Sequence, residues 1–247
     1  MLAIAAMAAV GGFLFGYDTG VIAGAQGLIK KQFELSDLWI EVITSSVLIG
    51  ATIGALTAGK IADRIGRRSA NMVAGIIFAV SAVILALAPT PEILIAGRVL
   101  IGFGVGLASV VGPLYIAETA PPKQRGAMVS FFQFAIVTGI LGAYVIDMSF
   151  SPPADAEAPL NHEGWRQMFG FGAIPGVLLT VGFIWMPRSP RWLVMKGRFD
   201  EAETVLARTI GADAAAKQLA SIKGELHEKG ACTKKVRLRD VKGIRLA

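Results

Sequence analysis

Apolar residues along the chain fall into blocks of about 20, separated by shorter polar stretches. An α-helix of about 20 apolar residues spans the hydrocarbon core of a bilayer. The first block does not resemble a signal peptide, because it lacks a basic n-region and further apolar blocks follow it. The pattern therefore predicts an all-α membrane protein with six transmembrane helices, at about 2–29, 39–61, 70–88, 93–117, 126–149 and 166–186.

The pattern changes after residue 187. Phe199, Ala202 and Leu206 recur at helical spacing among charged residues, which is typical of short amphipathic helices rather than of a membrane span. We therefore predict two domains: a six-helix transmembrane bundle at 1–187 and a cytoplasmic helical tail at 188–247.

Charge is segregated along the sequence. The stretch 188–247 carries 14 Lys and Arg against 7 Asp and Glu, whereas the rest is nearly balanced. Connections two and four are also basic, and the fifth is mostly acidic from Asp147 onward. By the positive-inside rule, connections two and four and both termini are cytoplasmic in a multi-pass cell-membrane protein. The basic stretch 188–247 directly follows a predicted membrane helix. Its charge therefore indicates a cytoplasmic location and not binding to nucleic acid.

Two ionisable residues, Asp18 and Arg98, lie deep within apolar blocks. A lone charge at that depth costs at least about 2.5–3.5 kcal/mol, so we expect them to pair inside the bundle. Two interpretations remain open: an ion pair that fixes the helices, or a carboxylate that binds and releases a proton as Arg98 approaches or withdraws. Nearby, Gly12, Gly16, Gly20 and Gly24 form a ridge that allows a neighbouring helix to pack closely.

Other polar positions have similar alternatives. Gln133, with Ile136 and Ile140 on the same helix face, suits a polyhydroxylated ligand or an interhelical hydrogen bond. Phe15 beside Asp18 is more typical of packing than of ligand contact. "GKIADRIGRR" (59–68) is predicted to form a tight loop, and with "AETAPPKQRGAM" and "PRSPRWL" it gives three charged corners that either set topology or lock one face.

Features of catalytic sites are missing from the sequence. The single cysteine excludes an internal disulfide, and no Cys/His cluster has metal-ligand spacing. No nucleophile–base constellation appears either. We therefore do not expect an enzyme, a metal site or a cofactor.

Several motifs, taken together and in order, resemble the sugar porter family of the major facilitator superfamily: "FGYDTGVIAG", "GKIADRIGRR", "GRVLIGFGVGLASVVGPLYIAE", "PPKQRG", "FFQFAI", "GWRQMF" and "PRSPRWL". The resemblance implies proton coupling at Asp18 and Arg98, and sugar contacts at Phe15, Gln133, Ile136 and Ile140. It further implies a conformational charge network of Gly59, Asp63, Arg67, Glu118, Arg125 and Arg191. One departure is Arg188, which stands where the family usually has an acid.

The resemblance also implies the function. Sugar porters have twelve spans in two halves, so this chain is expected to be an N-terminal half whose partners are a missing C-terminal half, the lipid bilayer and a sugar or polyol. The expected function is sugar:proton symport by alternating access, with the proton as coupling ion. The alternatives are a truncated fragment without transport of its own, a self-assembling pair of copies, a facilitator, and a sugar-binding sensor.

Overall fold

The computed structural model describes residues 2–121, 124–150 and 163–233, in which all regular secondary structure is helical. The basic end of the sequence (234–247) and the middle of the fifth connection (151–162) lie outside the described residues. The chain divides into two compact units, 1–187 and 188–247. The first contains α1 (Leu2–Gln32), α2 (Asp37–Ile65), α3 (Arg67–Ala86), α4 (Pro91–Thr119), α5 (Arg125–Phe150), α6 (Gly164–Phe171) and α7 (Ala173–Ile184).

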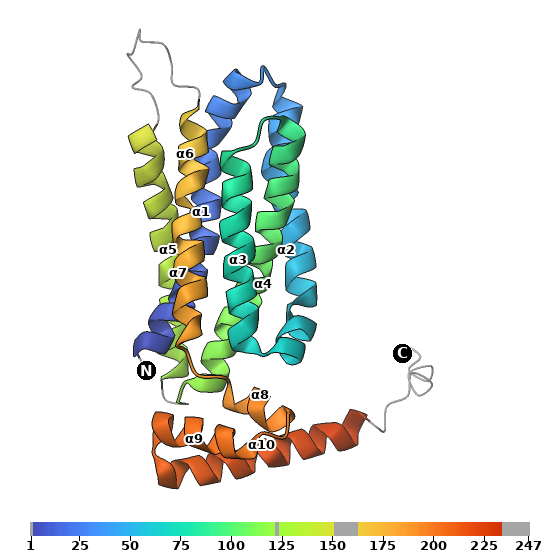
Figure 1. Ribbon diagram of the computed structural model, residues 1–247, viewed down its shortest axis with the longest axis vertical. Helices are drawn as coiled ribbons and strands as arrows, with labels where there is room; N and C mark the ends of the chain where they lie inside the picture. Colours follow the sequence, from blue (N-terminus) through green and yellow to red (C-terminus); the bar gives the residue numbers. More distant parts are fainter. Residues whose placement is uncertain (1, 122–123, 151–162, 234–247) are drawn as a thin grey trace, which may run out of the picture. The chain divides into compact units, whose positions relative to one another are not determined.

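The helices of the first unit form an up-and-down bundle (Figure 1). Within the described residues, five stretches are long and apolar enough to cross a bilayer: α2, α3, α4, α5, and α6 with α7 taken together. Large apolar side chains such as Leu56, Phe134 and Met148 are exposed on these helices. An apolar outer surface of this kind suits a lipid environment rather than water. The chain thus has the character of a multi-pass membrane protein.

Two pairs of helices, α1 with α5 and α2 with α4, pack most closely. A Cβ atom on Gly16 would collide with the carbonyl of Ile136 in α5, and one on Gly50 would collide with the carbonyl of Val99 in α4. The contacts are reciprocal, because Gly139 faces Phe13 and Gly102 faces Val47. Glycine removes the side chain that would hold the backbones apart. The predicted glycine ridge of the first span is therefore a packing surface, and its partner is α5.

The core of the first unit lies between α1, α3, α4 and α6–α7. Its large buried side chains include Leu14, Phe78, Trp165 and Phe169. The hydroxyl of Tyr17 in α1 donates a hydrogen bond of 2.6 Å to the carbonyl of Met168, which satisfies its polar end.

The structure corrects the predicted loop at 59–68. α2 continues to Ile65 and α3 begins at Arg67, so Gly59 and Asp63 are helical. The whole turn is made by Gly66, whose φ of 92° is in the region that glycine adopts without steric cost. The sixth apolar block also differs from expectation, because it is interrupted at Gly172, between α6 and α7.

The second unit contains α8 (Pro190–Met195), α9 (Phe199–Ile210) and α10 (Ala212–Thr233). At the start of α8, the Ser189 hydroxyl accepts a hydrogen bond of 3.2 Å from the Trp192 backbone N–H, which caps the helix. Leu193, Leu206 and Leu219, one from each helix, form a small core of their own. The amphipathic pattern after residue 187 thus corresponds to packed helices.

A pair of glycine substitutions in α2 tests the close packing. Gly50→Ala is expected to destabilise the protein by about 1–3 kcal/mol, because the new methyl group would overpack the α2–α4 contact. Gly59→Ala is the matched control, since a Cβ at Gly59 has no neighbour within 4 Å. The measurement is thermal unfolding in detergent; equal effects of the two variants would contradict the packing account.

Candidate functional site

Asp18 of α1 and Arg98 of α4 meet inside the first unit. Arg98 Nη1 lies 2.6 Å from Asp18 Oδ1, and both side chains are at least 95% buried. The Arg98 guanidinium also lies 6.0 Å from the centroid of the Phe169 ring. A buried charge is strongly unfavourable without a counter-charge at hydrogen-bonding distance. The two ionisable residues that the sequence places in apolar blocks therefore form one buried ion pair.

The ion pair faces a cavity of about 730 Å³ between α1, α2 and α4. Asp18 and Arg98 lie on its wall, together with Phe15. The other polar residues on this wall are Thr19, Gln26, Glu41, Thr44 and Ser45. The sequence analysis did not identify them as candidates, because a polar residue at any one of these positions is not unusual in its own helix. The cavity thus gives a small molecule or water access to a charged pair that is otherwise enclosed by apolar side chains.

The structure places the other predicted sugar contacts on α5. Ile136 and Ile140 pack against the α1 glycines, with atoms close to Gly12, Gly16 and Gly20. Gln133 is exposed on α5. None of these three lines the cavity beside Asp18. Of the four predicted sugar contacts, only Phe15 adjoins the ion pair, and the sugar-binding role of all four stays a prediction.

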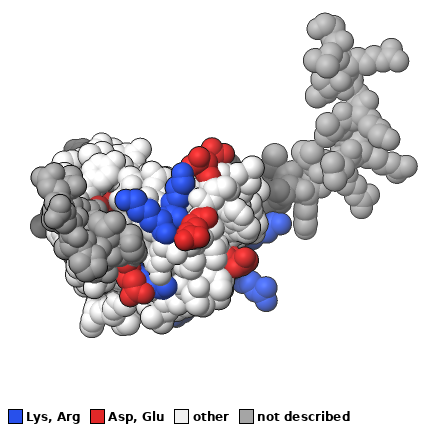
Figure 2. Space-filling model, turned by 90° about the horizontal axis from the view of Figure 1, so that it is seen from above, with Lys and Arg blue, Asp and Glu red and all other residues white. Residues whose placement is uncertain are grey.

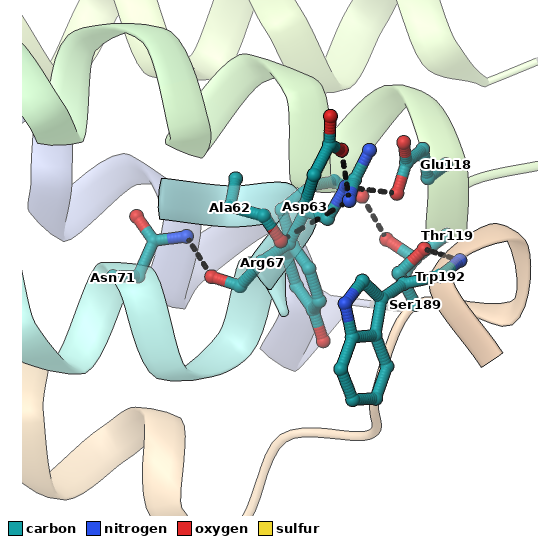
Figure 3. A network of polar contacts seen from close by, with 9 residues as sticks. Ala62, Asp63, Arg67, Asn71, Glu118, Thr119, Ser189 and Trp192 are labelled. Carbon is teal, nitrogen blue, oxygen red and sulfur yellow. Dashed lines mark hydrogen bonds and ion pairs between the residues drawn. The ribbon is translucent and has the colours of Figure 1, made fainter. Parts of the chain in front are cut away.

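A second charged cluster joins the ends of α2, α3 and α4 (Figure 3). Arg67 Nε lies 2.8 Å from Glu118 Oε2, and Arg67 Nη1 lies 2.8 Å from Asp63 Oδ1. The Arg67 and Glu118 side chains are about 95% buried, whereas Asp63 is half-exposed. Arg67 also donates a 3.2 Å hydrogen bond to the carbonyl of Ala62. Three of the predicted network residues are therefore held together by one guanidinium.

The remaining network residues are placed differently. Gly59 is exposed, with no atom within 4 Å of a Cβ built on it. Arg125 begins α5, and its Nε donates a 3.0 Å hydrogen bond to the carbonyl of Ala120. Arg191 lies in α8, in the second unit. Membership of Gly59, Arg125 and Arg191 in a conformational network stays a prediction.

Asp147 is a buried carboxylate that the sequence reasoning assigned to the fifth connection. It lies in α5 instead, where its Oδ2 accepts a 3.2 Å hydrogen bond from the Gly24 backbone N–H. Gly24 continues the ridge of Gly12, Gly16 and Gly20, each of which contacts a residue of α5. The four-residue spacing of these glycines indicated a close helix contact, but the sequence did not show that the partner was the helix carrying Asp147.

The bundle end that carries the α1–α2 connection has charges of both signs. On the face that Figure 2 presents, basic and acidic side chains lie beside one another on a largely uncharged surface. Lys30 and Asp37 form an ion pair across the connection. Trp165 Nε1 donates a 2.5 Å hydrogen bond to Gln32 Oε1, which ties the end of α1 to α6. One ion pair and one hydrogen bond thus link neighbouring helices at this end.

Comparison with known proteins places these features in a family. The model of the family described as "Sugar (and other) transporter" matches residues 4–243. The human proton myo-inositol cotransporter is 40% identical over 225 residues, covering 91% of this chain and 34% of that protein. The galactose-proton symporter of Escherichia coli K12 is 42% identical over 212 residues, covering 86% of this chain and 44% of that protein.

Solved structures agree with the sequence relatives. A structure of the proton:xylose symporter XylE superimposes with a TM-score of 0.86 at 34% identity, covering 92% of this chain and 53% of that chain. The described helices therefore have the fold of the major facilitator superfamily. The chain belongs to the sugar transporter family, and it corresponds to the N-terminal half. It spans about 34–44% of the length of the two curated relatives named above.

Removal of one partner from the Arg67 cluster tests its energetics. Glu118→Gln is expected to destabilise the protein by about 3–5 kcal/mol, because it leaves the buried Arg67 guanidinium without its buried counter-charge. Asp63→Asn is the control and should cost no more than about 1 kcal/mol, since Asp63 is half-exposed. Thermal unfolding of both variants in detergent measures the difference. A Glu118 variant as stable as the Asp63 variant would contradict this assignment.

Proposed function

We propose that this chain forms the N-terminal half of a proton-coupled symporter for a monosaccharide or polyol. The Asp18–Arg98 ion pair carries the proposal: it is buried, spans two helices and opens onto a cavity. A carboxylate paired in this way favours its charged form while Arg98 is near and its protonated form when Arg98 withdraws. Proton binding at Asp18 would thus be coupled to a movement of α1 relative to α4.

The family context supports a sugar or polyol as the substrate. Relatives named as transporters of myo-inositol, galactose and xylose match most of this chain at 40–46% identity. Gln133 contributes donors and an acceptor that suit hydroxyl groups, from an exposed position on α5. In the proposal, Gln133 and Phe15 face the sugar together with groups of the second half. The proposed mechanism uses no cofactor, and the proton is its coupling ion.

The proposed topology has six spans. α1 is the first and is added to the five apolar stretches described above, and α6 together with α7 forms the last. The N-terminal end of α1, the α2–α3 turn and the α4–α5 connection lie at one end of the bundle (Figure 1). Basic residues gather in these connections, so the positive-inside rule assigns this end to the cytoplasm. Both termini and the second unit are then cytoplasmic.

The Arg67 cluster suggests how one state is held in the transport cycle. Its buried ion pair joins α3 to α4 at the proposed cytoplasmic end. Alternating access requires contacts that form in one state and break in another. We propose that Asp63, Arg67 and Glu118, with Gly59, Arg125 and Arg191, belong to the contacts that stabilise the outward-facing state.

Neutralising Asp18 tests proton coupling. In a full-length protein that joins this chain to its C-terminal half, Asp18→Asn should abolish sugar accumulation driven by a pH gradient, because the amide cannot carry the proton. Exchange of sugar between the two sides at equal concentration should persist, which shows that the variant is folded and binds sugar. The measurement is uptake of labelled sugar into proteoliposomes. Accumulation by Asp18→Asn equal to that of the unmodified protein would refute the proposal.

Truncating Gln133 tests its place in the sugar site. Gln133→Ala should raise the KM for sugar about tenfold, the factor that corresponds to one lost hydrogen bond of ordinary strength. The pH dependence of transport should not change, since Gln133 does not titrate. Ser130→Ala, an exposed position one turn earlier on α5, is the matched control. A KM for Gln133→Ala that equals that of the control would remove Gln133 from the sugar site.

A further inference from the structure

The cavity beside the ion pair arises from the way the helices pair. Glycine contacts bring α1 against α5 and α2 against α4. The closest partner of α1 is therefore α5 and not α2, and the closest partner of α2 is α4 and not α1. The space left between α1, α2 and α4 has a volume of about 730 Å³. A water molecule occupies about 30 Å³ in the liquid, so this space can hold a chain of several waters.

The cavity has a buried floor and an exposed rim. Asp18 and Arg98 form the floor, whereas Gln26 and Glu41 are exposed. Gln26 lies eight residues beyond Asp18 in α1, which is about 12 Å at 1.5 Å per residue. The part of the cavity lined by Gln26 and Glu41 therefore lies between the ion pair and the end of the bundle that carries the α1–α2 connection. The rest of the opening is lined by the exposed residues Phe15, Thr19, Ser45 and Leu48.

Two polar atoms on the wall point to hydrogen-bonded water inside. Thr44 Oγ1 and Arg98 Nε are buried and have no hydrogen-bond partner among the residues that the structure describes. Both residues line this cavity. Buried polar groups are almost always hydrogen-bonded, to protein or to ordered water. A hydroxyl and a guanidinium N–H beside a space of this size are suited to hold water next to Asp18.

Glu41 is the ionisable group at the other end of this space. On the cavity wall the ionisable residues are Asp18 and Arg98 at the floor and Glu41 at the rim. A carboxylate at an exposed position exchanges protons readily with the aqueous phase, and water transmits them over several ångströms. The geometry supplies a donor, a water-sized path with a hydroxyl along it, and an acceptor.

We propose that this cavity is the route by which protons reach Asp18, with Glu41 as the proton-exchanging group at its mouth and Thr44 as the hydroxyl that positions water beside the ion pair. This inference rests on the proposed symport function. The Glu41 carboxyl gives its proton to a neighbouring water. Each water along the cavity then accepts one proton and passes on another, and the last water gives a proton to the Asp18 carboxylate. Glu41, left as a carboxylate, takes a new proton from the aqueous phase.

The test uses the full-length protein in proteoliposomes. Glu41→Gln should lower the initial rate of sugar uptake driven by a pH gradient by about tenfold, comparable to the loss of one hydrogen-bonded link, and leave sugar exchange at equal concentrations unchanged. Thr44→Val, which keeps the side-chain shape without the hydroxyl, should lower the same rate, and Glu41→Asp should restore most of it. Asp37→Asn is the matched control, because Asp37 is an exposed acid one turn earlier on α2 that does not line the cavity.

Each outcome decides between distinct accounts. Gradient-driven rates for Glu41→Gln and Thr44→Val equal to that of Asp37→Asn would overturn the route while leaving symport at Asp18 intact. An increase in the KM for exchange in both variants would also overturn it, because the cavity would then be contacting sugar. Accumulation that persists in Asp18→Asn would instead refute the underlying symport function. If Glu41→Gln does not reach the membrane, the gradient-driven rate of Thr44→Val, compared with that of Asp37→Asn, decides the matter.

Discussion

The buried ion pair between Asp18 and Arg98 is the constraint on which the rest of the first unit depends. Neither charge is stable at this depth without the other, so α1 and α4 are held together as long as both groups are charged. Each of these helices is in turn packed closely on a second one through glycine, α1 on α5 and α4 on α2. The ion pair thus links two closely packed helix pairs, and in the proposed mechanism a change in its protonation acts on all four helices.

The same packing explains where a functional cavity can lie. Close glycine contacts use one face of α1 and one face of α2, and the faces that remain enclose a space beside the ion pair. Thr44 and Glu41 do not stand out in the sequence, and the proposed proton route includes them because the fold places them on the same cavity as Asp18. At the other end of the bundle, Arg67 performs a similar connecting role by joining Asp63 and Glu118.

Part of this arrangement could be predicted from the sequence. Because a buried charge is costly, the sequence predicted that Asp18 and Arg98 form an ion pair. The spacing of the glycines predicted a close contact between helices. Apolar periodicity did not reveal which helix would make that contact, so Asp147 was assigned to a connection although it packs against Gly24. The prediction of a loop at 59–68 was wrong because charged residues at the end of a helix resemble a loop in the sequence. One residue with positive φ, Gly66, is enough to make the turn. Gln133 is exposed, and its proposed sugar site would also need groups of the second half.

Asp18 is proposed to be the site where sugar transport and proton transport are coupled. The most direct test of this coupling is the number of protons that purified full-length protein takes up from weakly buffered solution when it binds sugar, followed with a pH indicator. The account predicts proton uptake on sugar binding that disappears in Asp18→Asn, although this variant still binds sugar. Equal proton uptake by the unmodified protein and by Asp18→Asn would contradict it.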